Sequence, residues 1–195
     1  VGWVLLVQLL LINISAALNA YKLTHFFVIV PERTFSDNDN IFTKSWKLFT
    51  GPRYPRPAIS TVPVFPYDTV SFSTSNGLRI DAWYAVQDSA ARGTVILFHG
   101  SAGTKATLMD EANEFRYWGY DVLMVDFRGH GNSESNTTTI GMREAEEVKL
   151  AFDFVAAKGG KNIFLYGGSM GAVAVARAIS KYDLKPSGLI LEAPF

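Results

Sequence analysis

The stretch that decides the fold of this chain is Ile163-Phe164-Leu165-Tyr166-Gly167-Gly168-Ser169-Met170-Gly171-Ala172-Val173-Ala174. It opens with four apolar residues, rich in aromatic and branched side chains, as in a short buried strand. A serine flanked by glycines follows directly, and small residues that a helix tolerates come next. The stretch therefore predicts a strand, a sharp turn and a helix.

The pattern Gly167-x-Ser169-x-Gly171, placed between a strand and a helix, predicts a nucleophile elbow, in which a strained turn lifts the serine hydroxyl above the end of a sheet. A turn this tight brings the residues two before and two after the serine close together. A Cβ at either position would clash, which explains why both are glycine. Unpaired N–H groups at the start of the helix also favour negative charge beside Ser169. The alternative interpretation is a serine that caps an ordinary strand–helix turn.

The composition predicts a folded domain and excludes several classes of protein. Hydrophobic residues make up 48% of the 195 residues and charged residues 18%, so the chain can bury a sizeable core and is not disordered. Eighteen basic and eighteen acidic residues balance, which argues against nucleic-acid binding. The absence of cysteine excludes disulfides and thiolate chemistry. The three histidines lack the spacing of paired zinc ligands, so we expect no metal site.

The N-terminal segment, residues 1–22, predicts a transmembrane anchor or a signal segment. Residues 1–18 are uncharged and almost all apolar, a length that suits a membrane span, with Trp3 and Tyr21 as interfacial anchors. We favour a single-pass, membrane-attached protein, because the apolar run is long for a signal peptide. The alternatives are a signal peptide cleaved near residues 15–17, which implies a secreted or periplasmic protein, and a buried core helix.

A proline-rich segment follows. Six of the eight prolines lie between residues 31 and 66, and Gly51-Pro52-Arg53-Tyr54-Pro55-Arg56-Pro57 is unsuited to a regular helix or a central strand. We interpret residues 23–66 as an extended connector and residues 67–195 as the start of the catalytic domain.

The periodicity of the domain predicts an open α/β sheet. An antiparallel hairpin turns at Asn76-Gly77, between strands expected at residues 70–74 and 78–86. Buried parallel strands are expected at residues 94–98, 121–125 and 162–166, and a further strand at residues 188–191. Helices are expected at residues 104–118, 140–158 and 169–182. In such a sheet the loops after the parallel strands line one crevice.

Three of these loops carry recognisable motifs: HGxxG at residues 99–103, DxRGHGxS at residues 126–133 and GxSxG at residues 167–171. Together with Leu191-Glu192-Ala193-Pro194-Phe195, they occur in an order and spacing similar to those of the α/β-hydrolase family. The resemblance covers roughly residues 67–195. It is greatest to the membrane-attached hydrolase-domain proteins and to the branch of serine aminopeptidases and monoacylglycerol lipases.

This resemblance implies a serine hydrolase that needs no metal or organic cofactor. The hydroxyl of Ser169 would attack an ester, thioester, amide or peptide bond of a small molecule or peptide and form an acyl-enzyme. The backbone N–H groups of Ser101 and Met170 would bind the oxyanion. Gly100 and Gly103 would let the first loop bend close to the substrate.

The remaining polar residues of these loops are expected to support them. By the family's strand order, His99 lies near Ser169 and shapes the oxyanion loop; a role as catalytic base is the less favoured reading. We expect His130 one strand farther away, supporting its loop beside Arg128. Asp126 is expected to be a strand-end carboxylate that binds the turn over residues 128–133.

The family order is serine, then acid, then histidine, yet no histidine follows Ser169. We therefore expect the acid and base to lie beyond residue 195, and the chain to be an N-terminal portion of a hydrolase or a truncated product. The alternative function is a catalytically silent fragment, or a binding module on a hydrolase scaffold.

Overall fold

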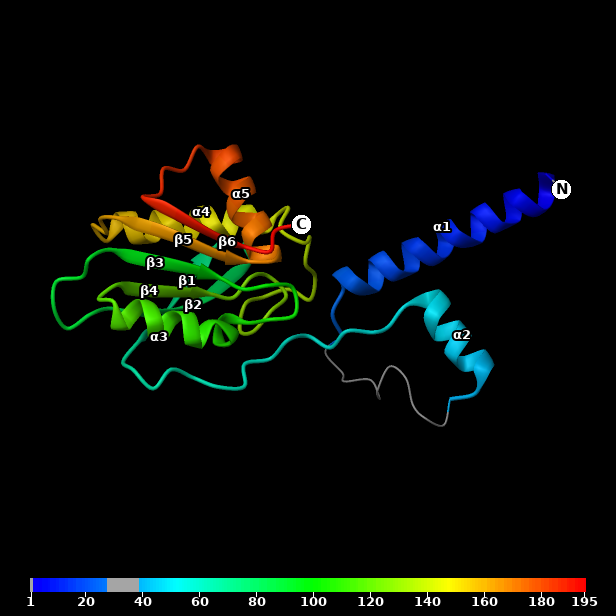
Figure 1. The fold of residues 1–195 in the computed structure, drawn as a ribbon, viewed down its shortest axis with the longest axis horizontal. Helices are drawn as coiled ribbons and strands as arrows, with labels where there is room; N and C mark the ends of the chain where they lie inside the picture. Colours follow the sequence, from blue (N-terminus) through cyan, green and yellow to red (C-terminus); the bar gives the residue numbers. More distant parts are fainter. Residues whose placement is uncertain (1, 28–38) are drawn as a thin grey trace. The chain divides into compact units, whose positions relative to one another are not determined.

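The structure is a computed structural model that describes residues 2–27 and 39–195. The chain divides into two compact units, Val1–Arg56 and Pro57–Phe195, shown in Figure 1. The second unit thus includes ten residues ahead of the predicted start of the domain at residue 67.

The first unit contains two helices, α1 (Gly2–Thr24) and α2 (Ile41–Thr50). Helix α1 covers the predicted membrane segment. Helix α2 begins where the Asn40 side chain accepts a hydrogen bond from the backbone N–H of Thr43 at 2.8 Å, and it ends at Gly51, which has φ +78°. The predicted extended connector is therefore wrong over residues 41–50. Prolines flank this stretch but none lies within it, so nothing prevents a helix.

The second unit is built on one six-stranded sheet. Its strands are β1 (Asp68–Ser73), β2 (Arg79–Ala85), β3 (Thr94–Phe98), β4 (Asp121–Val125), β5 (Ile163–Gly168) and β6 (Gly188–Glu192). The spatial order is β1-β2-β4-β3-β5-β6. The first two form the predicted antiparallel hairpin, and β4, β3, β5 and β6 run parallel. Because β3 pairs with β5, the loop after β3 begins beside the predicted elbow, as the strand order of the family implies.

The helices differ from their predicted bounds in two places. The segment expected as one helix over residues 104–118 is a short 3₁₀ helix, η1 (Lys105–Leu108), followed by α3 (Met109–Tyr117). Helix α4 (Glu144–Ala157) starts later than residue 140, because the preceding loop wraps around the Glu144 carboxylate, which accepts the N–H groups of Thr139 and Gly141. Helix α5 (Met170–Tyr182) follows the elbow.

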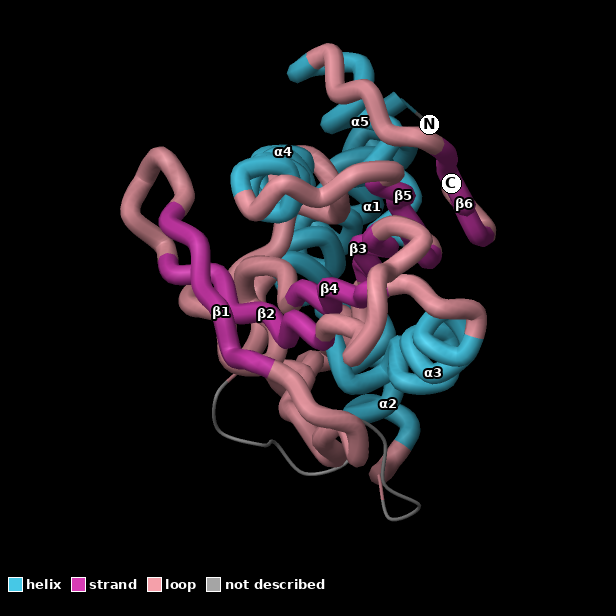
Figure 2. Tube along the Cα trace, turned by 90° about the vertical axis from the view of Figure 1, so that its left-hand side faces the viewer, coloured by secondary structure: helices cyan, strands magenta, loops and turns pink. Residues whose placement is uncertain are grey.

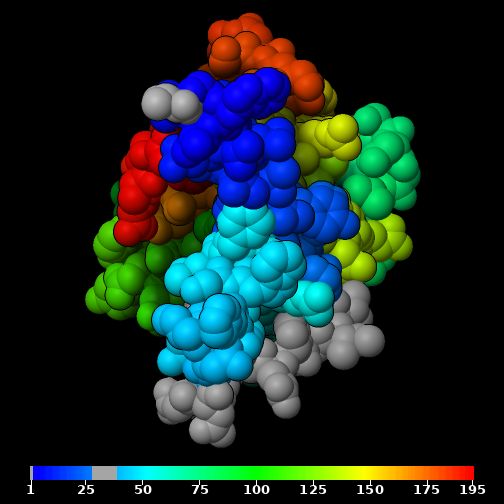
Figure 3. All heavy atoms as spheres, turned by 90° about the vertical axis from the view of Figure 1, so that its right-hand side faces the viewer, coloured from blue at the N-terminus to red at the C-terminus, as the bar shows by residue number. Residues whose placement is uncertain are grey.

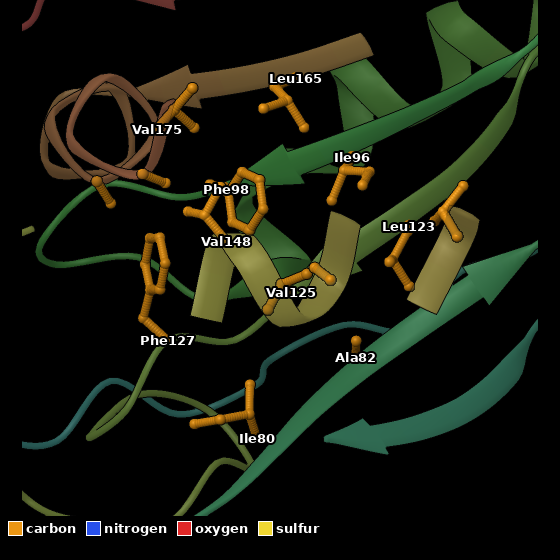
Figure 4. Packing of buried hydrophobic residues seen from close by; sticks show 14 of the residues in the cluster. Ile80, Ala82, Ile96, Phe98, Leu123, Val125, Phe127, Val148, Leu165 and Val175 are labelled. Carbon is orange, nitrogen blue, oxygen red and sulfur yellow. The ribbon is translucent and has the colours of Figure 1, made fainter. Parts of the chain in front are cut away.

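Helices cover the sheet on both faces, with α4 and α5 on one and α3 on the other (Figure 2). The side chains of β3 alternate between the two resulting cores: Ile96 and Phe98 join the first, and Val95 and Leu97 the second. Figure 4 shows the first core, where Phe98 lies among residues from the neighbouring strands and helices. Burial on both faces explains the continuous apolar runs by which these strands were predicted.

Candidate active site

Ser169 occupies a strained turn between β5 and α5. Its backbone has φ +49° and ψ −113°, a left-handed conformation that is uncommon for a residue other than glycine. Two backbone hydrogen bonds hold the turn: the N–H of Ser169 donates to the carbonyl of Glu192 on β6 at 2.8 Å, and its carbonyl accepts from Val173 at 3.2 Å. The backbone of Ser169 is therefore hydrogen-bonded both to strand β6 and to helix α5.

The two elbow glycines are required by close backbone contacts. A Cβ on Gly167 would lie 2.6 Å from the carbonyl carbon of Gly171, which is the approach expected from the GxSxG spacing. A Cβ on Gly171 would lie 2.3 Å from the carbonyl oxygen of Phe98, at the end of β3. The second glycine therefore also lets α5 pack against the neighbouring strand.

The loop after β3 lies against the serine. A Cβ on Gly100 would be 3.4 Å from the Cβ of Ser169, an ordinary contact, so at this position glycine is not required by that contact. Gly103 closes the loop by donating its N–H to the carbonyl of Gly100 at 3.1 Å, and its own Cβ would lie 2.6 Å from the Thr107 hydroxyl. Ser101 stands inside this turn, while Met170 is the buried first residue of α5.

His99 is fully buried and links this loop to the loop after β4. Its Nε2 accepts the backbone N–H of Phe127 at 3.1 Å, so its Nδ1 carries the hydrogen and donates to the carbonyl of Gly100 at 2.7 Å. Burial, followed by the nearby His130, lowers the pKa of His99 from 6.5 to about 3. The folded chain thus keeps the ring neutral at a pH where the unfolded chain would take up a proton.

His130 is also fully buried and contacts the same loop. Although β4 lies one strand farther from β5 than β3 does, the segment after β4 folds back, and the His130 ring lies 4.8 Å from that of His99. Its Nδ1 is 2.8 Å from the carbonyl of Arg128, and its Nε2 is 2.6 Å from the carbonyl of Ser101. Both ring nitrogens therefore face backbone carbonyls.

Asp126 and Arg128 form hydrogen bonds and an ion pair around the loop after β4. The Asp126 carboxylate accepts the N–H of Asn132 at 2.9 Å, and the Asp126 carbonyl accepts the Ser133 hydroxyl at 2.7 Å. Arg128 forms a buried ion pair with Glu147 on α4 and donates its backbone N–H to the same carboxylate. The loop is thus tied both to its own strand and to the helix that packs beside it.

Lys105 is a buried cation that no sequence motif marks. Its Nζ lies 2.5 Å from Asp81 Oδ1 and 2.5 Å from Asp126 Oδ2, and 4.7 Å from the ring centre of Trp83. Its backbone N–H also donates to Asp126 at 2.7 Å. The sequence signal for this cation was Asp81, a carboxylate inside an otherwise apolar strand. A buried carboxylate needs a positively charged or hydrogen-bonding partner, so Asp81 predicts that such a partner lies nearby.

A cluster of one tyrosine and two glutamates joins β5, β6 and α3. The Tyr166 hydroxyl donates to Glu192 at 2.5 Å and lies 3.4 Å from a Glu111 carboxylate oxygen. Burial and these carboxylates raise the pKa of Tyr166. Within residues 2–27 and 39–195, no group of three or more His, Cys, Asp or Glu side chains is placed to hold a metal ion.

A family model described as serine aminopeptidase, S33, matches residues 89–195, more than half of the chain. The chain belongs to this family of α/β hydrolases. The matched region includes all three motif loops.

A lysophosphatidylserine lipase of Xenopus tropicalis is 29% identical over 119 residues, which are 58% of this chain and 30% of that protein. An uncharacterized protein of Mycobacterium tuberculosis (strain ATCC 25618 / H37Rv) is 29% identical over 146 residues, 72% of this chain and 50% of that protein. The matches thus span 30% and 50% of the length of these relatives.

Solved structures agree with this assignment of the α/β-hydrolase fold. An esterase of Pyrococcus furiosus superposes with a TM-score of 0.63 at 28% identity, covering 72% of this chain and 57% of the esterase. An α/β serine hydrolase without a lid from Xanthomonas campestris has a TM-score of 0.55 at 24% identity, covering 68% of this chain and 64% of that protein, and supports the fold alone.

Proposed function

We propose that this chain carries the nucleophile of a serine esterase, and that the nucleophile is Ser169. The observation that carries the proposal is the backbone of this serine, held at φ +49° between β5 and α5 with the loop after β3 against it. A strained residue at a strand end, fixed by two hydrogen bonds, exposes its hydroxyl to a substrate without further rearrangement.

In the proposed reaction the Ser169 Oγ attacks the carbonyl carbon of an ester, and its proton passes to a base. The oxyanion that forms accepts hydrogen bonds from the N–H groups of Met170 and Ser101, each worth about 3 kcal/mol in the transition state. Collapse breaks the bond to the alcohol, which leaves with the proton, and an acyl-serine remains. Water then attacks the acyl-serine by the same route and releases the carboxylic acid.

The histidines of these loops support the site and do not act as its base. In His99, one ring nitrogen accepts from Phe127 and the other donates to Gly100. In His130, both ring nitrogens face backbone carbonyls, including that of Ser101. A base must accept the serine proton through a ring nitrogen that faces the hydroxyl. The proposal therefore assigns the base and its acid partner to other residues.

The substrate class that we propose is an ester with one long acyl chain, delivered from a membrane. Relatives named lysophosphatidylserine lipase and esterase support ester cleavage.

The described residues include one helix, α1, with the length and apolar character of a membrane span, properties that a signal sequence shares. We propose that α1 is retained as a single-pass anchor. A protein that stays in the membrane pellet after alkaline carbonate extraction supports the anchor, and release into the supernatant contradicts it.

Fluorophosphonate labelling of the native, full-length protein tests the nucleophile. We expect wild type and Ser187→Ala, a matched change at an exposed serine, to be labelled alike, and Ser169→Ala to lose the label. No labelling of the wild type, or labelling that survives Ser169→Ala, would overturn the proposal.

A substrate panel tests the bond that is cleaved. Turnover of long-chain acyl esters, with little cleavage of aminoacyl anilides, is the expected result. The reverse preference would favour the peptidase activity after which the family is described.

A further inference from the structure

The apolar face of α2 is exposed, in contrast to the usual arrangement of a helix in a soluble domain. Ile41, Phe42, Trp46 and Leu48 expose 71%, 82%, 66% and 68% of their surface. The lysines and threonines on the other side of α2 are only partly exposed. At 100° per residue, these four side chains fall on one half of the helix.

Polar contacts tie the end of α2 to α1. The Ser15 hydroxyl donates to the carbonyl of Phe49 at 2.6 Å, and the Lys22 ammonium donates to the carbonyl of Gly51 at 2.8 Å. A cation and a hydroxyl thus satisfy carbonyls that the helix end leaves unpaired. In Figure 3 the cyan helix α2 lies beside the blue helix α1, as these bonds require. Because Lys22 closes the apolar run of α1, the C-terminal end of α2 is held close to the end of a membrane-spanning α1.

We propose that α2 is an interfacial helix, whose apolar face lies in the headgroup and upper acyl region of an anionic bilayer. Residues 1–56 contain six basic and three acidic residues, which complements such a surface. Lys44 and Lys47 lie on the polar half of the helix, and Phe42, Trp46 and Leu48 on the apolar half, the pattern of helices that lie in the plane of a membrane.

An open groove of about 710 Å³ between the two helices fits the same occupant. It is lined mainly by α1 and by Phe49 of α2, and acyl chains of the bilayer would fill it. The proposal goes beyond ester hydrolysis and rests only on the membrane attachment proposed above.

A spin-label scan of the whole chain tests this assignment, because the protein contains no cysteine and each introduced cysteine is unique. Single cysteines from residue 41 to residue 50 carry a nitroxide in vesicles that contain anionic lipid. Collision with oxygen, which concentrates in the bilayer, is compared with collision with a water-soluble nickel chelate. Leu10→Cys in α1 provides the bilayer reference, and Ser89→Cys in an exposed loop provides the water reference.

We expect the ratio of oxygen to nickel collisions to follow the helical period. The neighbouring variants Leu48→Cys and Lys47→Cys form the matched pair, and the ratio should be several-fold higher at position 48. Nickel access at every position would overturn the proposal. So would a face closed to both probes, which indicates a protein partner or, with dipolar broadening between labels, a second copy of this chain. A water-like signal at Leu10→Cys would overturn the anchor itself.

Discussion

Replacing Lys105 by methionine tests whether the buried charges hold the two loops of the site together. The ammonium bridges Asp81 on β2 and Asp126 after β4, and both carboxylates are more than nine-tenths buried. Methionine keeps most of the side-chain volume but removes the charge and both hydrogen bonds. The variant therefore leaves the buried Asp126 carboxylate facing Asp81 without the ammonium that bridged them, although Arg79 still lies 3.3 Å from Asp81.

The expected cost is about 3–5 kcal/mol of unfolding free energy, the range for removing one partner of a buried ion pair. For a unit of this size that corresponds to a fall in Tm on the order of 10 °C. Lys149→Met is the matched control. Lys149 pairs with Asp153 one turn away on α4, with side chains 39% and 49% exposed. Such a pair contributes only about 0.3–0.5 kcal/mol.

Equilibrium urea unfolding of the two variants, followed by tryptophan fluorescence, measures the difference. Trp83 reports directly, because Lys105 lies over its ring. The double variant with Asp81→Asn should cost less than the sum of the single variants, since the two groups interact. If Lys105→Met loses no more stability than Lys149→Met, the assignment of Lys105 as a bridge between the loops is wrong.

Two further predictions concern the buried histidine and the elbow. Because the pKa of His99 is lowered to about 3, its contribution to stability is complete above pH 6.5 and is lost as the pH falls. Between pH 6.5 and pH 5 the wild type should lose about 2 kcal/mol through this residue, and His99→Gln should lose that much less; equal pH profiles in urea unfolding would contradict this. Gly171→Ala should cost about 1–3 kcal/mol because its Cβ would meet the Phe98 carbonyl. Gly168→Ala, whose Cβ would meet nothing within 4 Å, should be nearly neutral, and equal losses in thermal unfolding would refute the steric argument.

The parallel strands β3, β4 and β5 were predictable because they are largely buried on both faces, unlike β6, which is exposed. In a run such as residues 94–98, consecutive apolar residues indicate a strand without any alternation with polar residues. The glycines at residues 167 and 171 indicate the turn that follows β5. Helix α2 was not predicted because its own sequence signals are weaker than those of the residues around it. The prolines on either side of residues 41–50 dominate the composition of the segment, whereas the signals for the helix, Asn40 as a cap and an apolar half-face, are local and weak.

The polar residues of the site were predictable only where a motif names them. Asp126 could be selected from the sequence because it directly follows a predicted strand and begins a glycine-rich motif. Lys105 has no such mark, since a lysine in a turn is usually solvated and only the fold brings Asp81 to it. Long-range pairing of this kind depends on the register between β2 and β4, which no local pattern contains.

Burial of a titratable group in this crevice is therefore weak evidence that the group takes part in catalysis. His99, His130, Asp126 and Lys105 are all fully buried, and each has a partner in a neighbouring loop. A group that must exchange a proton with substrate needs a free lone pair facing the cleft, and the hydrogen bonds of His99 leave it none. Hydrogen bonds of these residues go instead to carbonyl and N–H groups of the loops. Because His130 Nε2 lies 2.6 Å from the Ser101 carbonyl, we expect the position of the Ser101 N–H, on which the proposed oxyanion site depends, to respond to changes in this buried polar network.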